Sequence, residues 1–96
     1  MDNKRMYELI DEFISLGYEY KIDICTPKFV KKSNEFYNDW SKTHIIEFRP
    51  IDKEHNYAIY SQNYYGTCMY LTVREAFLAS EFAKCLKEAK YAKQCT

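Results

Sequence analysis

The sequence predicts an α+β fold of two layers, in which an N-terminal and a C-terminal helix pack on one antiparallel β-sheet. Residues 43–73 carry three strand-like runs, at 44–49, 56–62 and 67–71, separated by polar turns. A helical apolar pattern precedes these runs and another follows them. A chain of 96 residues is long enough for one core, so we expect a single α+β domain over residues 1–96. The sheet should be a three-stranded meander joined by one N-terminal strand.

The first helix is expected over residues 3–16, with Asp2 or Asn3 as its N-cap. Its apolar side chains recur three and four positions apart, which places them on one helical face. They are Met6, Leu9, Ile10, Phe13 and Ile14. Gly17 follows the helix at the position where a left-handed residue commonly ends it.

Residues 18–25 alternate between apolar and polar side chains, which is the period of a strand that is buried on one face. We expect this strand to pair with the meander. Thr26 and Pro27 then resemble an N-cap and the first residue of a helix. Apolar side chains farther on fall on one helical face, so a helix is predicted over residues 27–41. A broken helix or an ordered loop is the alternative, because Lys31, Lys32 and Asn34 weaken the pattern.

The meander should turn at residues 52–56 and 63–66, and the last helix follows it directly. Thr72 and Glu75 have the spacing of a capping box, which marks the start of this helix, and we expect the helix to reach Ala92. The predicted core combines the inward faces of all elements. It contains Met6, Ile10, Phe13, Tyr20, Ile22, Ile24, Ile46, Phe48, Ile59, Met69, Leu71, Leu78, Phe82 and Leu86.

Composition narrows the choice of partner and of cellular location. Fourteen basic and fourteen acidic residues cancel, so the whole chain has no field that would attract nucleic acid. No apolar run is long enough to span a membrane, and no leader peptide is apparent, so we expect a soluble protein in the cytoplasm of the host cell. The four cysteines form no close pair and should be free thiols, with a disulfide or a zinc site as the alternative.

Residues with catalytic potential are few, so no enzymatic activity, metal or cofactor is expected. Gly17 and Gly66 stand alone and form no phosphate-binding loop. His55 lies in a charged turn, and His44 opens a strand, where a structural role is the simpler interpretation. A couple between Cys68 and His44 is geometrically conceivable, but no third residue is available to orient it.

Tyrosine is the most unusual feature of the composition, with ten in the chain and five of them between residues 57 and 70. Tyrosine and arginine are enriched at protein interfaces because they supply a large contact area and a polar tip. Coding bias and the need to cover a small sheet are the alternative explanation. We predict that a partner protein is contacted by Glu47, Arg49, Tyr60, Gln62, Tyr64, Tyr65, Tyr70 and Phe77.

The order of elements resembles the small type II-A anti-CRISPR proteins of phages and mobile elements. The resemblance covers a leading helix at residues 6–16, a meander at 44–71 and a closing helix at 72–92. It implies a small inhibitor that blocks a target sterically, such as a host nuclease or a defence complex. The best-known members are strongly acidic whereas this chain is neutral, which argues against mimicry of a nucleic-acid duplex.

Two other functions remain as alternatives at this stage. The helix–strand–helix order also resembles double-stranded-RNA-binding domains, and aromatic side chains on a sheet can stack single-stranded bases. Against this, the last helix begins with one arginine and two glutamates, and Glu47 shares the outer face of the sheet. A homodimer is the third possibility, because Phe77 and Tyr91 lie off the buried stripe of the last helix.

Overall fold

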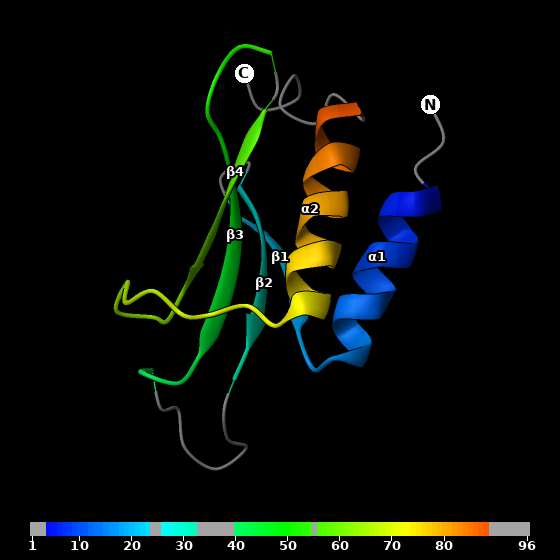
Figure 1. Cartoon of the computed structure of the whole chain (residues 1–96). Coiled ribbons are helices and arrows are strands. Elements are labelled where there is room, and N and C mark those ends of the chain that lie inside the picture. The colour runs from blue at the N-terminus through cyan, green and yellow to red at the C-terminus, as the bar shows by residue number, and fades with distance from the viewer. Residues whose placement is uncertain (1–3, 24–25, 33–39, 55, 89–96) are drawn as a thin grey trace.

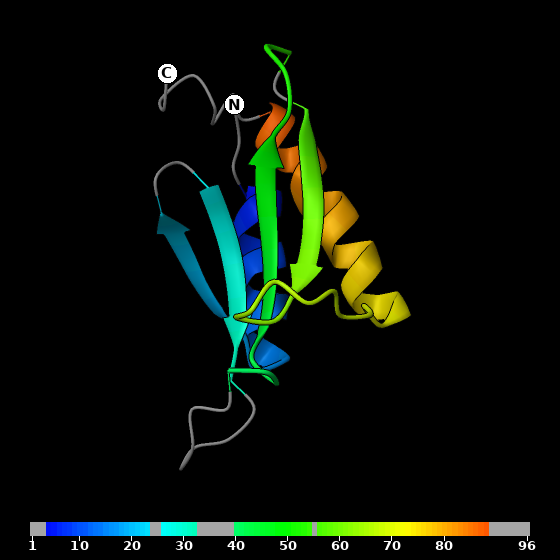
Figure 2. The same cartoon turned by 90° about the vertical axis from the view of Figure 1, so that its left-hand side faces the viewer.

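The protein consists of a helical layer and a sheet layer. The computed structural model describes residues 4–23, 26–32, 40–54 and 56–88. The described elements are α1 (Lys4–Ser15), β1 (Glu19–Asp23), β2 (Thr26–Lys31), β3 (His44–Pro50), β4 (Tyr57–Gln62) and α2 (Val73–Glu88). The strands form one antiparallel sheet in the order β1-β2-β3-β4. Both helices pack on one face of this sheet and leave the other face open (Figures 1 and 2). The predicted two-layer α+β fold is therefore confirmed.

Helix α1 follows the predicted apolar stripe, with one exception. Met6, Leu9 and Phe13 are buried, whereas Ile14 at the edge of the stripe is half exposed. Gly17 takes the left-handed conformation, with φ of +99°, and the amide of Tyr18 donates to the carbonyl of Phe13 at 3.1 Å. This is the predicted glycine-terminated helix end. The predicted caps Asp2 and Asn3 lie outside the described residues.

The predicted helix over residues 27–41 is wrong at its start, where the chain forms strand β2 instead. Strand β2 lies between β1 and β3, so β1 pairs with β2 and not with the meander. Pro27 is tolerated in this inner strand because the pairing with β3 begins only at Lys28. Phe29 lies buried on the helix side and Lys28 on the other, as the period of a strand requires. Residues 33–39 lie outside the part of the chain that is described.

The predicted strand at residues 67–71 is also wrong, because only a single bridge joins Cys68 to Gln62. Backbone pairing with β4 is limited to this bridge and its two hydrogen bonds, from the Asn63 amide to the Thr67 carbonyl at 2.8 Å and from the Met69 amide to the Ser61 carbonyl at 3.0 Å, and the Asn63 side chain holds the turn. Its Oδ1 accepts hydrogen bonds from the amides of Tyr65 and Thr67, both at 2.9 Å. Gly66 completes the predicted turn with φ of +85°.

Helix α2 begins with the predicted capping box. The amide of Glu75 donates to Thr72 Oγ1 at 3.0 Å, and the amide of Thr72 donates to Glu75 Oε1 at 2.9 Å. Leu78, Ala79, Phe82 and Leu86 form its buried face. The predicted extension to Ala92 falls on residues 89–96, which are outside the described residues.

Packed phenylalanine rings join the two layers. The Phe13 and Phe29 rings stack with centroids 4.0 Å apart, and Phe82 of α2 lies 5.1 Å from Phe29 and 5.0 Å from Phe48. Most of the predicted core is buried or packed against the buried cluster, but Ile22 is half exposed and Met69, which is only partly buried, does not belong to it. Strand β1 is at the edge of the sheet, so Ile22 has a cross-strand neighbour, Pro27, on one side only.

The predicted core residue Ile24 lies outside the described residues. Neither of the described helices has the length and apolar character that a membrane span requires.

Candidate functional site: the open face of the sheet

The open face of the sheet collects four of the eight predicted partner contacts. Arg49, Glu47, Tyr60 and Gln62 occupy the alternate positions of β3 and β4 that point away from the helices. Glu47 is directly opposite Tyr60 in the antiparallel register, and Ile45 is opposite Gln62. Their role in binding stays a prediction, whereas their placement on one solvent-facing surface is a property of the fold.

Charged and aromatic side chains on this face hold one another in place. Glu47 accepts a hydrogen bond from Arg49 Nε and lies 3.4 Å from Lys28 Nζ on the neighbouring strand. The Lys28 and Glu47 side chains are only 20% and 13% exposed, so water screens this pair less than an ordinary surface ion pair. The Arg49 guanidinium also covers the Tyr60 ring at 4.1 Å from its centroid. This contact restricts the Tyr60 ring, so less side-chain entropy would be lost when a partner binds it.

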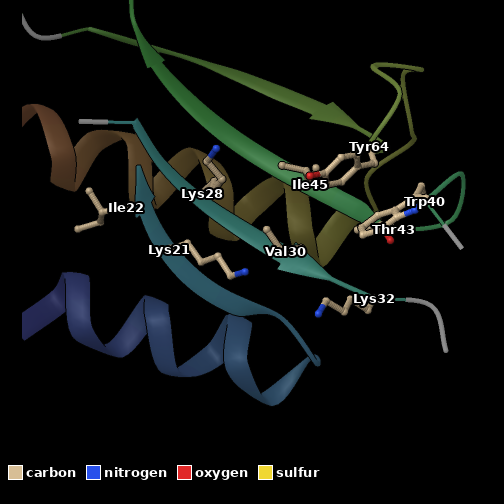
Figure 3. A pocket seen from close by; sticks show the side chains of 9 residues that line it. All are labelled: Lys21, Ile22, Lys28, Val30, Lys32, Trp40, Thr43, Ile45 and Tyr64. Atoms are coloured by element: carbon tan, nitrogen blue, oxygen red, sulfur yellow. The ribbon is translucent and has the colours of Figure 1, made fainter. Parts of the chain in front are cut away.

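An open groove lies on the same face, beside this cluster (Figure 3). It encloses about 650 Å³, within the range of clefts that hold ligands. The lysines are spread along the groove: Lys21 of β1 and Lys28 of β2 face each other, and Lys32, which follows β2, lies nearer Trp40, with Val30 and Ile45 between them (Figure 3). Its remaining described lining residues are Ile22, Trp40, Thr43 and Tyr64.

Two aromatic rings form one wall of the groove. Trp40 and Tyr64 lie with ring centroids 4.4 Å apart and planes tilted by 47°. Backbone contacts fix the two segments that carry them. The amide of Tyr64 donates to the carbonyl of Trp40 at 3.1 Å, and Asn63 Nδ2 donates to the carbonyl of Ser41 at 3.0 Å. The wall is therefore part of the fold, although Trp40 and Tyr64 are 37% and 59% exposed.

The other predicted contacts lie apart from the centre of the open face. Tyr65 and Tyr70 are exposed in the segment between β4 and α2. Phe77 is half exposed on α2, in the layer on the opposite side of the sheet from Tyr60 (Figure 1). Phe77 and Tyr60 therefore do not share one flat surface, and a partner would have to wrap around the domain to touch both.

A buried polar network lies between the covered face of the sheet and the start of α2. The Tyr18 hydroxyl donates to Glu75 Oε2 at 2.5 Å and contacts His44 Nδ1 at 2.9 Å. His44 Nε2 lies 2.6 Å from Ser61 Oγ, which donates to the carbonyl of Met69 at 2.7 Å. Tyr18, His44 and Glu75 are 2%, 8% and 8% exposed. The network ties the entry to β1, strands β3 and β4, and helix α2 into one unit.

Counting protons shows what His44 does in this network. Tyr18 gives its only proton to Glu75, so His44 Nδ1 must carry a proton and donate it to the tyrosine oxygen. A neutral imidazole then accepts at Nε2, which requires Ser61 to turn its proton from Met69 to the ring. A charged imidazolium would instead donate to Ser61. His44 thus has the structural role expected from sequence, and both of its ring nitrogens are engaged by residues other than Cys68.

Burial and hydrogen bonding set the ionisation of the three groups. Burial lowers the pKa of His44 below its ordinary 6.5, an effect that exceeds the opposing pull of the Glu75 carboxylate. Burial alone would raise the pKa of Glu75, but hydrogen bonds from Tyr18 and from the Thr72 amide hold that pKa below 4.5. Burial, followed by the contact with Glu75, raises the pKa of Tyr18 above 10. At neutral pH Glu75 is therefore a carboxylate and Tyr18 a neutral phenol, and burial favours a neutral imidazole at His44, which needs the Ser61 hydroxyl turned from Met69 toward Nε2.

Metal and thiol chemistry has little support in the described part of the chain. No group of three or more histidine, cysteine, aspartate or glutamate side chains comes together there. Cys68 is exposed and Cys85 half-buried, and both are free thiols. Cys25, Cys95 and His55 lie outside the described residues.

Comparison with known protein families, curated proteins and solved structures finds no match to this chain. A role cannot therefore be transferred from a relative, and the residues on the open face have to indicate it.

The groove was not predicted because a helix was expected over residues 27–41, which supply four of its nine described lining residues. These four are Lys28, Val30, Lys32 and Trp40. A usable signal was present, because residues 26–31 alternate around Pro27 and Phe29 with the period of a strand. The contact between Trp40 and Tyr64 has no such signal, since it depends on the tertiary fold.

Proposed function

We propose that this chain is a non-enzymatic protein-binding module, and that the open face of its sheet is the contact surface. The observation that carries the proposal is the one-sided packing of the helices. It leaves Arg49, Tyr60 and Gln62 on the open side of a four-stranded sheet, with Tyr64 exposed in the turn that follows β4. Aromatic and arginine side chains that are already ordered lose little entropy on binding, which favours their use as interface anchors.

The mode of action we propose is steric. A small domain without catalytic chemistry can inhibit a larger protein by covering a surface that the larger protein needs. The order of elements motivates an inhibitor of a host nuclease or defence complex, of the anti-CRISPR type, as the specific form of this proposal. The polar network of Tyr18, His44 and Glu75 supports a structural rather than a catalytic interpretation, because its members bond to one another and to the backbone inside the protein.

Nucleic-acid binding is the second candidate, and the groove is the observation that favours it. Lysines beside exposed aromatic rings are a common arrangement in proteins that bind single strands. Glu47 weakens this candidate less than its sequence position suggests, because Lys28 and Arg49 already pair with it.

The test is affinity capture by the tagged full chain from host lysate, with and without nuclease. Three proteins are compared: the natural chain, an Arg49→Ala/Tyr60→Ala variant of the open face, and a Tyr7→Ala control on the exposed side of α1. We expect one protein to be retained after nuclease treatment by the natural chain and by the control. The open-face variant should bind it at least about tenfold more weakly.

Two results would contradict the proposal. One is a partner that both variants retain equally, which would place the contact elsewhere. The other is a partner that disappears on nuclease treatment, which would favour the nucleic-acid alternative. Circular dichroism of each variant separates a lost contact from a lost fold.

A further inference from the structure

Two lysines face each other across neighbouring strands in the groove on the open face, an arrangement that is unfavourable in sheets. Lys21 of β1 and Lys28 of β2 are directly opposite each other in the antiparallel register. Two cations at such positions destabilise a sheet unless an anion lies nearby. Glu19 lies 3.8 Å from Lys21 and Glu47 lies 3.4 Å from Lys28, but neither glutamate is among the described residues that line the groove.

Lys32 adds a third cation to the same groove, at the end nearer Trp40 (Figure 3). The described lining residues are otherwise aliphatic, aromatic or threonine. The chain as a whole carries no net charge, so this local concentration of positive charge is not a consequence of a basic composition. Glu19 and Glu47 offset part of this charge, because they pair with Lys21 and Lys28, and three lysines against two glutamates leave an excess of +1. The electrostatic complement of the groove is therefore a ligand with a net negative charge.

The rest of the lining identifies the second property of that ligand. Val30 and Ile45 are neighbours in the register of β2 and β3 and form an aliphatic floor. Trp40 and Tyr64 form the wall above it. An aliphatic floor against a fixed aromatic wall suits an apolar side chain, whose burial removes apolar area from water.

We propose that this groove binds an acidic segment of the partner protein, with carboxylates beside Lys21 and Lys32 and an apolar side chain against Trp40 and Tyr64. The inference rests on the proposed function and specifies its partner. A nucleic-acid strand fits less well for two reasons. Trp40 and Tyr64 contact each other and form a wall, whereas strand-borne platforms stack successive bases. The floor is aliphatic where such a platform would need rings.

The test uses Trp40 as its reporter, because it is the only tryptophan of the chain and lies in the groove. The probe is a short synthetic peptide in which glutamates flank a central phenylalanine. We expect a saturable change in tryptophan emission on titration of the full chain, with an affinity that falls as salt is added. The matched probes are the same peptide with lysines in place of glutamates, and a single-stranded oligothymidylate.

Charge reversal decides where the peptide binds. The Lys21→Glu/Lys32→Glu variant should bind the acidic peptide about tenfold more weakly or not at all. Lys84→Glu, an exposed lysine on α2, carries the same kind of change in the helical layer and should bind as the natural chain does. Thermal unfolding of each variant confirms that the fold is kept.

Three outcomes would overturn the inference: no response to the acidic peptide, equal binding by both charge variants, or tighter binding of the oligothymidylate. The same variants separate this inference from the proposed function in the capture experiment. If Arg49→Ala/Tyr60→Ala loses the partner and Lys21→Glu/Lys32→Glu keeps it, the open face is the interface and the groove does not take part in binding. If both variants retain the partner, the open face is not the interface and the proposed function is contradicted.

Discussion

The two faces of the sheet carry different kinds of side chain, although the same strands supply both. On the covered face, Phe29, Ile46 and Phe48 are fully buried against the helices. On the open face, the neighbours of these residues in sequence are Lys28, Val30, Ile45, Glu47 and Arg49. The covered face determines stability and the open face is free to serve binding, so substitutions one residue apart should have very different consequences.

The largest expected effect is on the covered face of β2. Phe29→Ala removes a ring that packs on Phe13 and Phe82, and we expect it to lower the free energy of unfolding by about 3–5 kcal/mol. Val30→Ala is the matched change on the open face and should cost about 1 kcal/mol or less, because Val30 is only partly buried. Urea denaturation of both variants measures the difference. Equal losses would show that the two faces do not divide stability and binding as described.

The buried network gives the next effect. Tyr18→Phe keeps the ring but removes the hydroxyl between Glu75 and His44, and should cost about 1–3 kcal/mol. Tyr60→Phe makes the same chemical change on the open face and should stay within about 0.5 kcal/mol of the natural chain. Thermal or urea unfolding compares the two. A Tyr18→Phe variant as stable as the natural chain would mean that the network contributes specificity without stability.

The same network should make stability depend on pH in a defined direction. The pKa of His44 is lower in the folded chain than its ordinary 6.5, so the unfolded state binds more protons as the pH falls through that value. Glu75, whose pKa is held below 4.5, acts in the same direction at lower pH. We therefore expect the free energy of unfolding to decrease from about pH 6.5 downward. The raised pKa of Tyr18 predicts a second decrease above pH 10.

Urea titrations across this pH range measure both decreases. The Tyr18→Phe variant should lack the alkaline decrease that Tyr18 causes. Stability that rises on acidification from pH 6.5 would contradict the assignment of a buried neutral imidazole to His44.

The start of α2 gives a smaller effect. Thr72→Ala removes the oxygen that accepts the Glu75 amide, and should cost about 1 kcal/mol. Ser80→Ala is the control, because Ser80 is exposed within the same helix and should change stability by no more than about 0.5 kcal/mol. Denaturation midpoints are the measurement. A loss on Thr72→Ala no larger than that of Ser80→Ala would show that the cap adds nothing to stability.

The smallest effect on stability, and the largest on binding, is expected on the open face. Arg49→Ala exchanges an exposed side chain and should leave the free energy of unfolding within about 0.5 kcal/mol. It should nevertheless weaken partner binding, because Tyr60 loses the guanidinium that covers its ring. A large loss of stability in this variant would blur the division between the two faces.

Local sequence patterns correctly predicted those elements for which the tertiary contacts favour the same structure as the local sequence. The apolar stripes of both helices, the glycine end of α1 and the capping box of α2 all follow from spacing alone. The prediction for residues 26–31 was wrong because Thr26 and Pro27 also suit the start of a helix. Pairing with β1 and β3 outweighed that local preference. The strand predicted at residues 67–71 was wrong because pairing with β4 ends after one bridge at Cys68, where Asn63 Oδ1 takes the Thr67 amide that a longer ladder would use.

The site was predictable only in part, for a similar reason. The alternation of β3 and β4 placed Glu47, Arg49, Tyr60 and Gln62 on one face in advance. The groove was not predictable, because it needs β2 beside β1 and the contact of Trp40 with Tyr64. The network of Tyr18, His44 and Glu75 was equally hidden, since its members are 26 and 57 positions apart along the chain.

The most direct test of the open face as the binding surface is a nuclear magnetic resonance titration of the labelled chain with the captured partner. We expect the amide signals that shift or broaden to belong to strands β1 to β4 and the turn at residues 63–66. The signals of α1 and α2, including Tyr7 and Phe77, should stay in place. Shifts concentrated in the helices, with the strands unchanged, would contradict the account and assign the interface to the helical layer.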